Sequence, residues 1–498
     1  MADKRNIQDT AKGLGLEEID TEVAVDRIAD DLLLVFHRSS KDNKAKQAKI
    51  EQLFAEWHPG GRLVDDGRSI NPILLIGPPG HGKTTSFKAA AKRVSNGLGM
   101  RFLENSAIDD AIEHDGITEN DFVFVSQETA GVVSSLEWAG LPSRKVGKNG
   151  SPDLMGRLFS QRLDALQHSG CGVLLLDDFL NATPAIQNVG LPLAEERRYG
   201  DLSLAKSYVA MTGNMGTIDG THTTKISSAI RNRVRPYFIQ DNVPNFTKRV
   251  STDPVLRDEV GDCGVCGFLQ KFSDMFSSMP NPKEMGGYNT PRSWDKAITE
   301  IRRIAWANGG RTGLAKGMRE IQREVASLLG HEVAHKYTTY LRSMMDLADP
   351  LARQVIMEGK LDAETLATKF KDGYSANEQH FAYQYALALA DYTALKVIQD
   401  KGKLPEAVTR FATGLSPMDG QSFNFGMNSF QQKLANTCDN LAEKRPDGRM
   451  LSIKSRMEIC EIFKKHPTIK HDQVTAMTDV LSNADKHLVM NRRRQRRS

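Results

Sequence analysis

The stretch from residue 77 to residue 84 constrains this chain more than any other. It reads GPPGHGKT and fits the phosphate-binding pattern GxxxxGK(S/T) at every fixed position. An apolar run at residues 73–76 precedes it, and good helix formers follow it from residue 85 to residue 92. A strand, a glycine-rich turn and a helix in this order place backbone N–H groups at the positive end of the helix, where they bind phosphate oxygens. The sequence therefore predicts a nucleoside triphosphate site.

We expect nine residues of this loop and of the first helical turn to bind the nucleotide. They are Gly77, Pro78, Pro79, Gly80, His81, Gly82, Lys83, Thr84 and Thr85. The ammonium group of Lys83 is expected to reach the β- and γ-phosphates, and the hydroxyl of Thr84 is expected to bind Mg²⁺.

The composition describes an ordinary globular protein. A chain of 498 residues is too long for one core and predicts about three domains. No apolar run approaches the length of about 20 residues that spans a bilayer, and the first residues lack an apolar signal core. Five cysteines do not indicate a disulfide framework, so we expect Cys263 and Cys266 to be reduced thiols in a loop, with a metal site as the minor alternative. The expected location is cytoplasmic.

The positive net charge is local. Five arginines lie within the last seven residues, and without them the basic residues of the chain balance the acidic ones. A generally basic nucleic-acid-binding surface is therefore not indicated, and this tail at 491–498 is the segment that could touch nucleic acid.

Residues 173–178 read as a buried strand that ends in two carboxylates, with another apolar strand predicted at 122–125. The carboxyl end of such a strand delivers acidic groups to a metal. We expect Asp177 to hold Mg²⁺ and Asp178 to orient the attacking water. Because the Asp178 side chain is short, Glu195 or Glu196 is a candidate to assist it.

Two further strands are predicted at 208–212 and 237–239. Asn214 follows the first of them and can hydrogen-bond the attacking water and the γ-phosphate. Arg231 and Arg233 lie at a short helix before the second strand, where an arginine finger can neutralise charge on the transferred phosphoryl group. Farther on, Thr290 and Pro291 predict a helix start that places Arg292 in its first turn.

These elements predict an α/β fold with five parallel strands between helices, its site lying along the carboxyl edge of the sheet. The expected domains are a helical prefix at 1–60, the α/β nucleotide-binding domain at 61–245, and a helical lid at 246–345. A helical C-terminal region at 346–490 and the arginine-rich tail follow. The function of the C-terminal helices is not readable from the sequence.

The ordered motifs resemble those of AAA+ ATPases. Within that superfamily the chain is similar to the MoxR-like, dynein-related branch, especially the MoxR-like ATP-binding proteins encoded by bacteriophages. The segments 138–143 and 195–201 carry this closer resemblance. Asp178 departs from the pattern, because most relatives have a glutamate there.

The resemblance implies a ring, expected to be hexameric, that binds ATP and Mg²⁺ between subunits. Lys83, Thr84 and Asp177 fall on the nucleotide and metal positions, and Asn214 falls on the polar sensor. Arg233 falls on the finger that acts on the neighbour's nucleotide, with Arg231 as a second candidate, and Arg292 falls on the second sensor in the lid. The implied activity is ATP hydrolysis that remodels a protein partner, which in this family is often a von Willebrand A-type protein. The implied setting is the cytoplasm of a bacterium or a phage-infected host.

The segment 131–150 is long and glycine-rich, and it carries Trp138, Arg144, Lys145 and Lys148. In a ring it would approach the pore, where an aromatic group and cations grip polypeptide or nucleic acid. A flexible insertion is the other interpretation, and the two stay open.

His331 and His335 belong to an HExxH sequence, the pattern of zinc metalloproteases. The apolar positions of this helix put both histidines on its polar side, and no downstream Glu or His stands out as a third ligand. Zinc proteolysis is therefore a minor alternative. A nucleic-acid motor or loader, and a degenerate ATPase that only binds nucleotide, are the others.

Overall fold

The computed structural model describes residues 13–481 apart from 14, 66–69, 133–140, 146–153, 159, 200–201, 222, 224–227, 257, 259, 279–285, 419, 446–447 and 479–480. The chain divides into two compact units. The first unit contains residues 1–242, 278–285 and 290–292, and the second contains the remaining residues from 243 onward.

A sheet of seven parallel strands forms the centre of the first unit. Its spatial order is β1-β11-β2-β10-β7-β4-β3. The strands are β1 (Glu17–Ile19), β2 (Ile73–Ile76), β3 (Arg101–Glu104), β4 (Asp121–Glu128), β7 (Cys171–Asp177), β10 (Ser207–Gly213) and β11 (Arg235–Ile239). The central strands are buried on both faces, as expected for parallel strands covered by helices.

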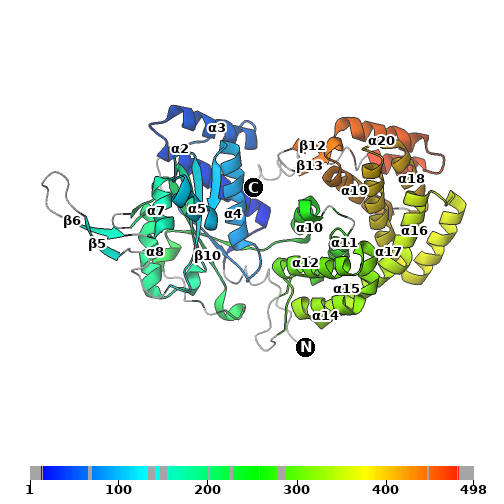
Figure 1. Cartoon of the computed structure of the whole chain (residues 1–498), viewed down its shortest axis with the longest axis horizontal. Helices are drawn as coiled ribbons and strands as arrows, with labels where there is room; N and C mark the ends of the chain where they lie inside the picture. The colour runs from blue at the N-terminus through cyan, green and yellow to red at the C-terminus, as the bar shows by residue number, and fades with distance from the viewer. Residues whose placement is uncertain are drawn as a thin grey trace. The chain divides into compact units, whose positions relative to one another are not determined.

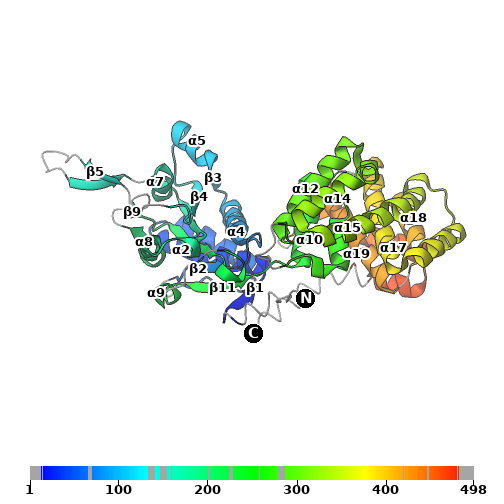
Figure 2. The ribbon, with the colours of Figure 1, turned by 90° about the horizontal axis from the view of Figure 1, so that it is seen from below.

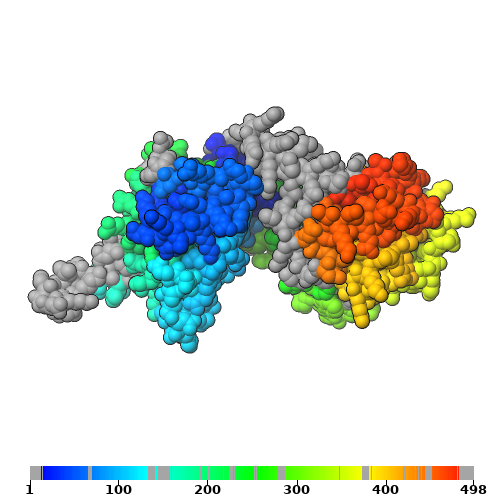
Figure 3. Space-filling view, turned by 90° about the horizontal axis from the view of Figure 1, so that it is seen from above, coloured from blue at the N-terminus to red at the C-terminus, as the bar shows by residue number. Residues whose placement is uncertain are grey.

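Helices cover both faces of this sheet (Figure 1). One face packs against α2 (Thr21–Ser39), α3 (Lys44–Trp57) and α4 (Lys83–Leu98). The other packs against α5 (Ser106–His114), α7 (Gln161–His168) and α8 (Pro184–Glu196). In Figure 3, α2 and α3 form the dark blue surface of the first unit.

All five strands predicted from the sequence are present and parallel, and two short outer strands, β1 and β3, extend the sheet. β1 is part of the chain segment that leads into α2, and this helix is tied to the sheet by buried polar contacts. The hydroxyl of Tyr208 on β10 donates to Asp31 of α2 at 2.8 Å, and it accepts the backbone N–H of Ile73 at 2.9 Å. Arg235 also pairs with Asp31. The N-terminal helices therefore share a core with the sheet.

Two antiparallel hairpins accompany the sheet. One is formed by β5 (Leu141–Lys145) and β6 (Leu154–Leu158), and the other by β8 (Arg198–Tyr199) and β9 (Leu202–Ser203). The β5–β6 hairpin projects from the first unit in two orthogonal views (Figures 1 and 2). Its base exposes a cross-strand apolar pair, because Leu141 and Leu158 are 59% and 64% exposed.

The second unit is built mainly of helices. They are α10 (Val243–Thr252), α11 (Val265–Lys271), α12 (Pro291–Ala307), α13 (Gly313–Lys316), α14 (Met318–Leu329), α15 (His331–Ser343), α16 (Asp349–Arg353), α17 (Ala363–Gln399), α18 (Pro405–Leu415), α19 (Gly420–Thr437) and α20 (Ile453–Lys465). A small hairpin of β12 (Ala442–Arg445) and β13 (Gly448–Leu451) precedes α20. No helix in the described ranges has the length and apolar character needed to cross a membrane.

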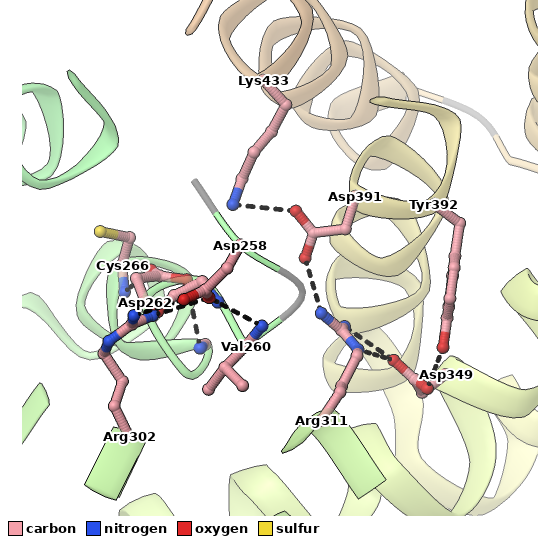
Figure 4. A network of polar contacts seen from close by, with 12 residues as sticks. Asp258, Val260, Asp262, Cys266, Arg302, Arg311, Asp349, Asp391, Tyr392 and Lys433 are labelled. Carbon is pink, nitrogen blue, oxygen red and sulfur yellow. Dashed lines mark hydrogen bonds and ion pairs between the residues drawn. The ribbon is translucent and has the colours of Figure 1, made fainter. Parts of the chain in front are cut away.

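A buried ionic network joins the earlier helices of this unit to the later ones (Figure 4). Arg311, just before α13, contacts Asp349 of α16 at 2.7 Å and Asp391 of α17 at 3.3 Å. Lys433 of α19 contacts Asp391 at 2.8 Å, and the hydroxyl of Tyr392 donates to Asp349 at 2.7 Å. The network borders a cavity of about 80 Å³. Residues of the predicted lid (246–345) and of the predicted C-terminal region (346–490) therefore share polar contacts within one unit.

Candidate nucleotide-binding site

Three neighbouring strands bring their carboxyl ends together at one edge of the sheet. β2 leads into the glycine-rich loop, β7 ends at Asp177, and β10 ends just before Asn214. β10 lies between the other two, with Gly213 opposite Ile76 and Met211 opposite Leu176. This order explains how residues more than 90 positions apart in the chain meet at one site.

The loop needs glycine at two positions where the backbone is left-handed. Gly80 has φ +84° and Gly82 has φ +83°, which side chains with a Cβ rarely adopt. A Cβ at Gly80 would lie only 2.8 Å from the hydroxyl oxygen of Thr290. These glycines let the loop curl ahead of α4, whose first N–H groups point towards the site for the phosphates.

Lys83 is the first residue of α4, and its side chain is buried at the centre of the site. Its Nζ donates to the carbonyl oxygens of Gly77 at 2.8 Å and Pro78 at 3.0 Å, and to Oδ1 of Asn214 at 2.8 Å. Burial lowers the pKa of Lys83 to about 8, although Asp178 and other nearby carboxylates oppose the shift. The cation is thus held by neutral acceptors, which a bound phosphate could replace.

Thr84 and Asp177 form the part of the site that could hold a metal. The hydroxyl of Thr84 lies 3.0 Å from both carboxylate oxygens of Asp177. The hydroxyl of Thr212 donates to Asp177 at 2.5 Å and accepts the backbone N–H of Asp178 at 2.9 Å. A hydroxyl and a carboxylate oriented in this way are oxygen ligands of the kind that Mg²⁺ takes beside substrate phosphates.

Asp178 follows β7 with a left-handed backbone, at φ +52°. The side-chain amide of Asn214 donates to Oδ1 of Asp178 at 3.1 Å. Burial, followed by the neighbouring Asp177 carboxylate, raises the pKa of Asp178 above its ordinary value. Asn214 therefore contacts both the buried lysine and the second acidic residue.

The other predicted loop residues lie in different environments. Pro78 and Pro79 lack an N–H group and can shape the loop but cannot donate to phosphate. The side chain of His81 is fully buried, and burial followed by the nearby Lys83 lowers its pKa to about 3. Its imidazole is therefore neutral, and only its backbone is placed to meet a phosphate. Thr85 is exposed in the first turn of α4.

Arg292 lies beside the loop in the first turn of α12. Its backbone N–H donates to the carbonyl oxygen of Gly80 at 3.3 Å, and its side chain is exposed. Its positive charge is one of the smaller influences that lower the pKa of Lys83. The structure therefore brings this predicted residue to the glycine-rich loop.

Arg231 and Arg233 lie away from the site. Arg231 ends α9 (Ser228–Arg231), and Arg233 precedes the amino end of β11, where Arg235 is opposite Ile73 at the start of β2. The phosphate-binding loop begins at the other end of β2. Arg233 contacts Glu195 of α8 at 2.5 Å. Neither arginine is brought to the nucleotide site of its own chain.

Three polar residues near this edge were not among the residues predicted for the site. Thr212 orients Asp177 as described above. Asp219 is buried, and its charge raises the pKa of Lys83 against the effect of burial. Glu128 ends β4 and is paired in register with Asp177. Polar residues end the apolar runs of β4 and β10, and this sequence pattern could have identified Glu128 and Thr212.

The HExxH sequence forms the start of α15, where His331 and His335 are exposed on the polar side as expected. No three His, Cys, Asp or Glu side chains are grouped for a metal in the described part of the chain. The residues of this helix therefore do not fit a zinc site. Cys263 and Cys266 are free thiols. Trp138, Lys148 and the arginine-rich tail lie outside the described residues.

The strand order and the converging residues define a P-loop nucleotide-binding fold of the α/β class. A strand, β10, lies between the P-loop strand and the strand that carries the acidic pair, and a helical region follows the sheet. This strand order and the helices that follow confirm the α/β fold with a helical C-terminal part that the sequence predicts.

Three of the similar solved structures are a RuvB mutant, PCH-2 and Hsp104. For a mutant of RuvB from Thermotoga maritima the identity is 12%, covering 84% of this chain and 94% of that chain, with a TM-score of 0.25. For PCH-2 of C. elegans the identity is 13%. The match covers 60% of this chain and 70% of that chain, with a TM-score of 0.25. For the closed state of Hsp104 with ATPγS and FITC casein the identity is 16%. The match covers 62% of this chain and 48% of that chain, with a TM-score of 0.25. No protein-family model and no curated protein matches the sequence. Since the TM-scores are only 0.25, we assign the site from the geometry of this chain alone.

Proposed function

We propose that this chain hydrolyses ATP at the site formed by Lys83, Thr84, Asp177, Asp178 and Asn214. The observation that carries this proposal is the convergence of a buried lysine, a hydroxyl–carboxylate pair and a polar amide at the mouth of a glycine-rich loop. Lys83 would neutralise the β- and γ-phosphates, and Thr84 and Asp177 would hold Mg²⁺, which stabilises charge on the phosphates. Arg292 would meet the nucleotide from the first turn of α12, and the support is the hydrogen bond from its backbone N–H to the carbonyl oxygen of Gly80 in the loop.

We infer that the active form is a ring, expected to be a hexamer, in which Arg233 acts on the nucleotide of a neighbouring subunit. The support is the position of Arg233 near the amino end of β11, at the edge of the sheet opposite the P-loop. An arginine supplied from another subunit leaves a monomer nearly inactive, because this residue is worth about 10³-fold or more in rate. Arg231 is the second candidate for the same role.

A mixing experiment tests this arrangement. Arg233→Ala and Lys83→Ala are each expected to lower turnover by about 100-fold or more. In an equimolar mixture, some interfaces pair the intact Lys83 of one variant with the intact Arg233 of the other. Random assembly makes about one quarter of the interfaces intact, so about a quarter of wild-type turnover should return. A mixture that is no more active than its components contradicts a finger supplied by a neighbour.

We further propose that hydrolysis remodels a protein partner, as the MoxR-like resemblance suggests, with a von Willebrand A-type protein as one candidate. The projecting β5–β6 hairpin and its exposed Leu141–Leu158 pair offer a surface for polypeptide. A nucleic-acid motor is the alternative, and zinc proteolysis receives no support from the exposed histidines. Turnover that ignores single- and double-stranded DNA favours a protein partner, whereas strong DNA stimulation with steep salt dependence favours the motor. The proposed location is the cytoplasm of a bacterium or a phage-infected host.

A further inference from the structure

A third carboxylate lies at the tip of the strand next to the acidic pair. Glu128 is the last residue of β4 and is opposite Asp177 in the parallel register of β4 and β7. Side chains alternate between the two faces of a strand. Phe122 and Phe124 of β4 pack in the same core as Val173 and Leu175 of β7, together with side chains of α4. Continuing this alternation places Glu128 and Asp177 on the same face, the one covered by α4.

The tip of β4 is fixed against the tip of β7. The backbone N–H of Thr129 and its hydroxyl both donate to the carbonyl oxygen of Asp177, at 2.9 Å and 2.8 Å. The carboxylate of Glu128 is exposed and forms no hydrogen bond or ion pair with any other residue that the structure describes. Glu128 therefore presents a carboxylate with unoccupied acceptor positions beside the proposed metal ligand.

Asp178 is less well suited to activate water. Its side chain is one methylene shorter than that of glutamate, and its Oδ1 already accepts a hydrogen bond from Asn214.

We propose that Glu128 orients the attacking water and accepts its proton, an inference that rests on the proposed ATPase function. The water oxygen forms a bond to the γ-phosphorus. The bond between the γ-phosphorus and the bridging oxygen breaks, and its electron pair leaves with ADP. The water proton passes to the carboxylate of Glu128. Asp178 and Asn214 then act as positioning residues for the γ-phosphate and the water.

The test is the Glu128→Gln variant of the full-length chain. Glutamine keeps the size of the side chain but cannot accept the proton, so kcat should fall by about 100-fold or more, within the range of general-base catalysis. The affinity for a fluorescent ATP analogue should change by less than about threefold, because the phosphate-binding lysine and the metal ligands remain. Asp178→Asn is expected to lower kcat by less than Glu128→Gln does. Glu113→Gln, on the exposed side of α5, is the matched control and should leave kcat unchanged.

Several outcomes would overturn the proposal. One is turnover by Glu128→Gln within about twofold of wild type, while the wild type itself hydrolyses ATP. A second is a loss that excess Mg²⁺ restores, because Glu128 would then be a metal ligand. A third is loss of nucleotide binding, which would make Glu128 a structural residue. A wild-type chain that binds ATP without hydrolysing it would instead contradict the proposed function, and this inference would fall with it.

Discussion

Replacing Lys83 with alanine is expected to weaken nucleotide binding by about 100-fold or more, equivalent to about 2.7 kcal/mol. The reason is that Lys83 is the buried cation at the centre of the loop. Among the described residues, its ammonium group donates hydrogen bonds to two loop carbonyls and Asn214. A phosphate group that enters the loop would gain a charge-assisted hydrogen bond from it, and alanine removes that bond. Titration of a fluorescent ATP analogue measures the change directly.

The control for this variant is Lys88→Ala on the same helix. Lys88 is partly exposed and pairs with Glu104, so its loss should leave nucleotide affinity within about twofold. The pH dependence provides a second check. Since the pKa of Lys83 in the free protein is about 8, affinity should be constant below that pH and fall above it as the ammonium group loses its proton. Equal affinity of Lys83→Ala and wild type would contradict the assigned site.

Replacing Arg311 with alanine is expected to destabilise the second unit by about 3–5 kcal/mol, the cost of leaving buried charges without their partner. The side chain of Arg311 is 11% exposed, and it pairs with Asp349 and Asp391, which are 9% and 20% exposed. Burial opposes the charged form of Arg311, but these two carboxylates raise its pKa above the ordinary value. Urea unfolding followed by circular dichroism measures the loss.

Two further variants show whether the loss comes from this network. Arg303→Ala removes an exposed arginine from α12 in the same unit, and it should change stability by at most about 0.5 kcal/mol. Asp349→Asn should cost less in the Arg311→Ala background than in the wild type, because the two residues interact. Additive effects, or a loss below about 1 kcal/mol in Arg311→Ala, would contradict a coupled buried network.

The central part of the fold is readable from local patterns. Four of the five predicted strands contain four consecutive apolar residues. All five are strands in the structure. The outer strands lack such a pattern. In β1 only Ile19 is buried, and in β3 only Leu103 is buried, so neither has the continuous apolar run that reveals a strand covered on both faces.

The site is predictable where one motif contains several of its residues, as in the loop from Gly77 to Thr84. The site is less predictable where residues that are far apart in the sequence become neighbours in the fold. Glu128 lies three residues beyond the apolar run that marked its strand, and its proximity to Asp177 depends on the strand register. Arg311 is a lone charged residue in a glycine-rich stretch, and its partners come from helices that begin 38 or more residues later. Local sequence patterns contain no information on such pairings.

The central claim is that the chain hydrolyses ATP at the P-loop, and steady-state release of phosphate by the purified full-length protein tests it most directly. We predict turnover that requires Mg²⁺, stops when EDTA is added, and is lost in Lys83→Ala while persisting in Lys88→Ala. ATP binding without any release of phosphate, or release that Lys83→Ala retains, would contradict this claim.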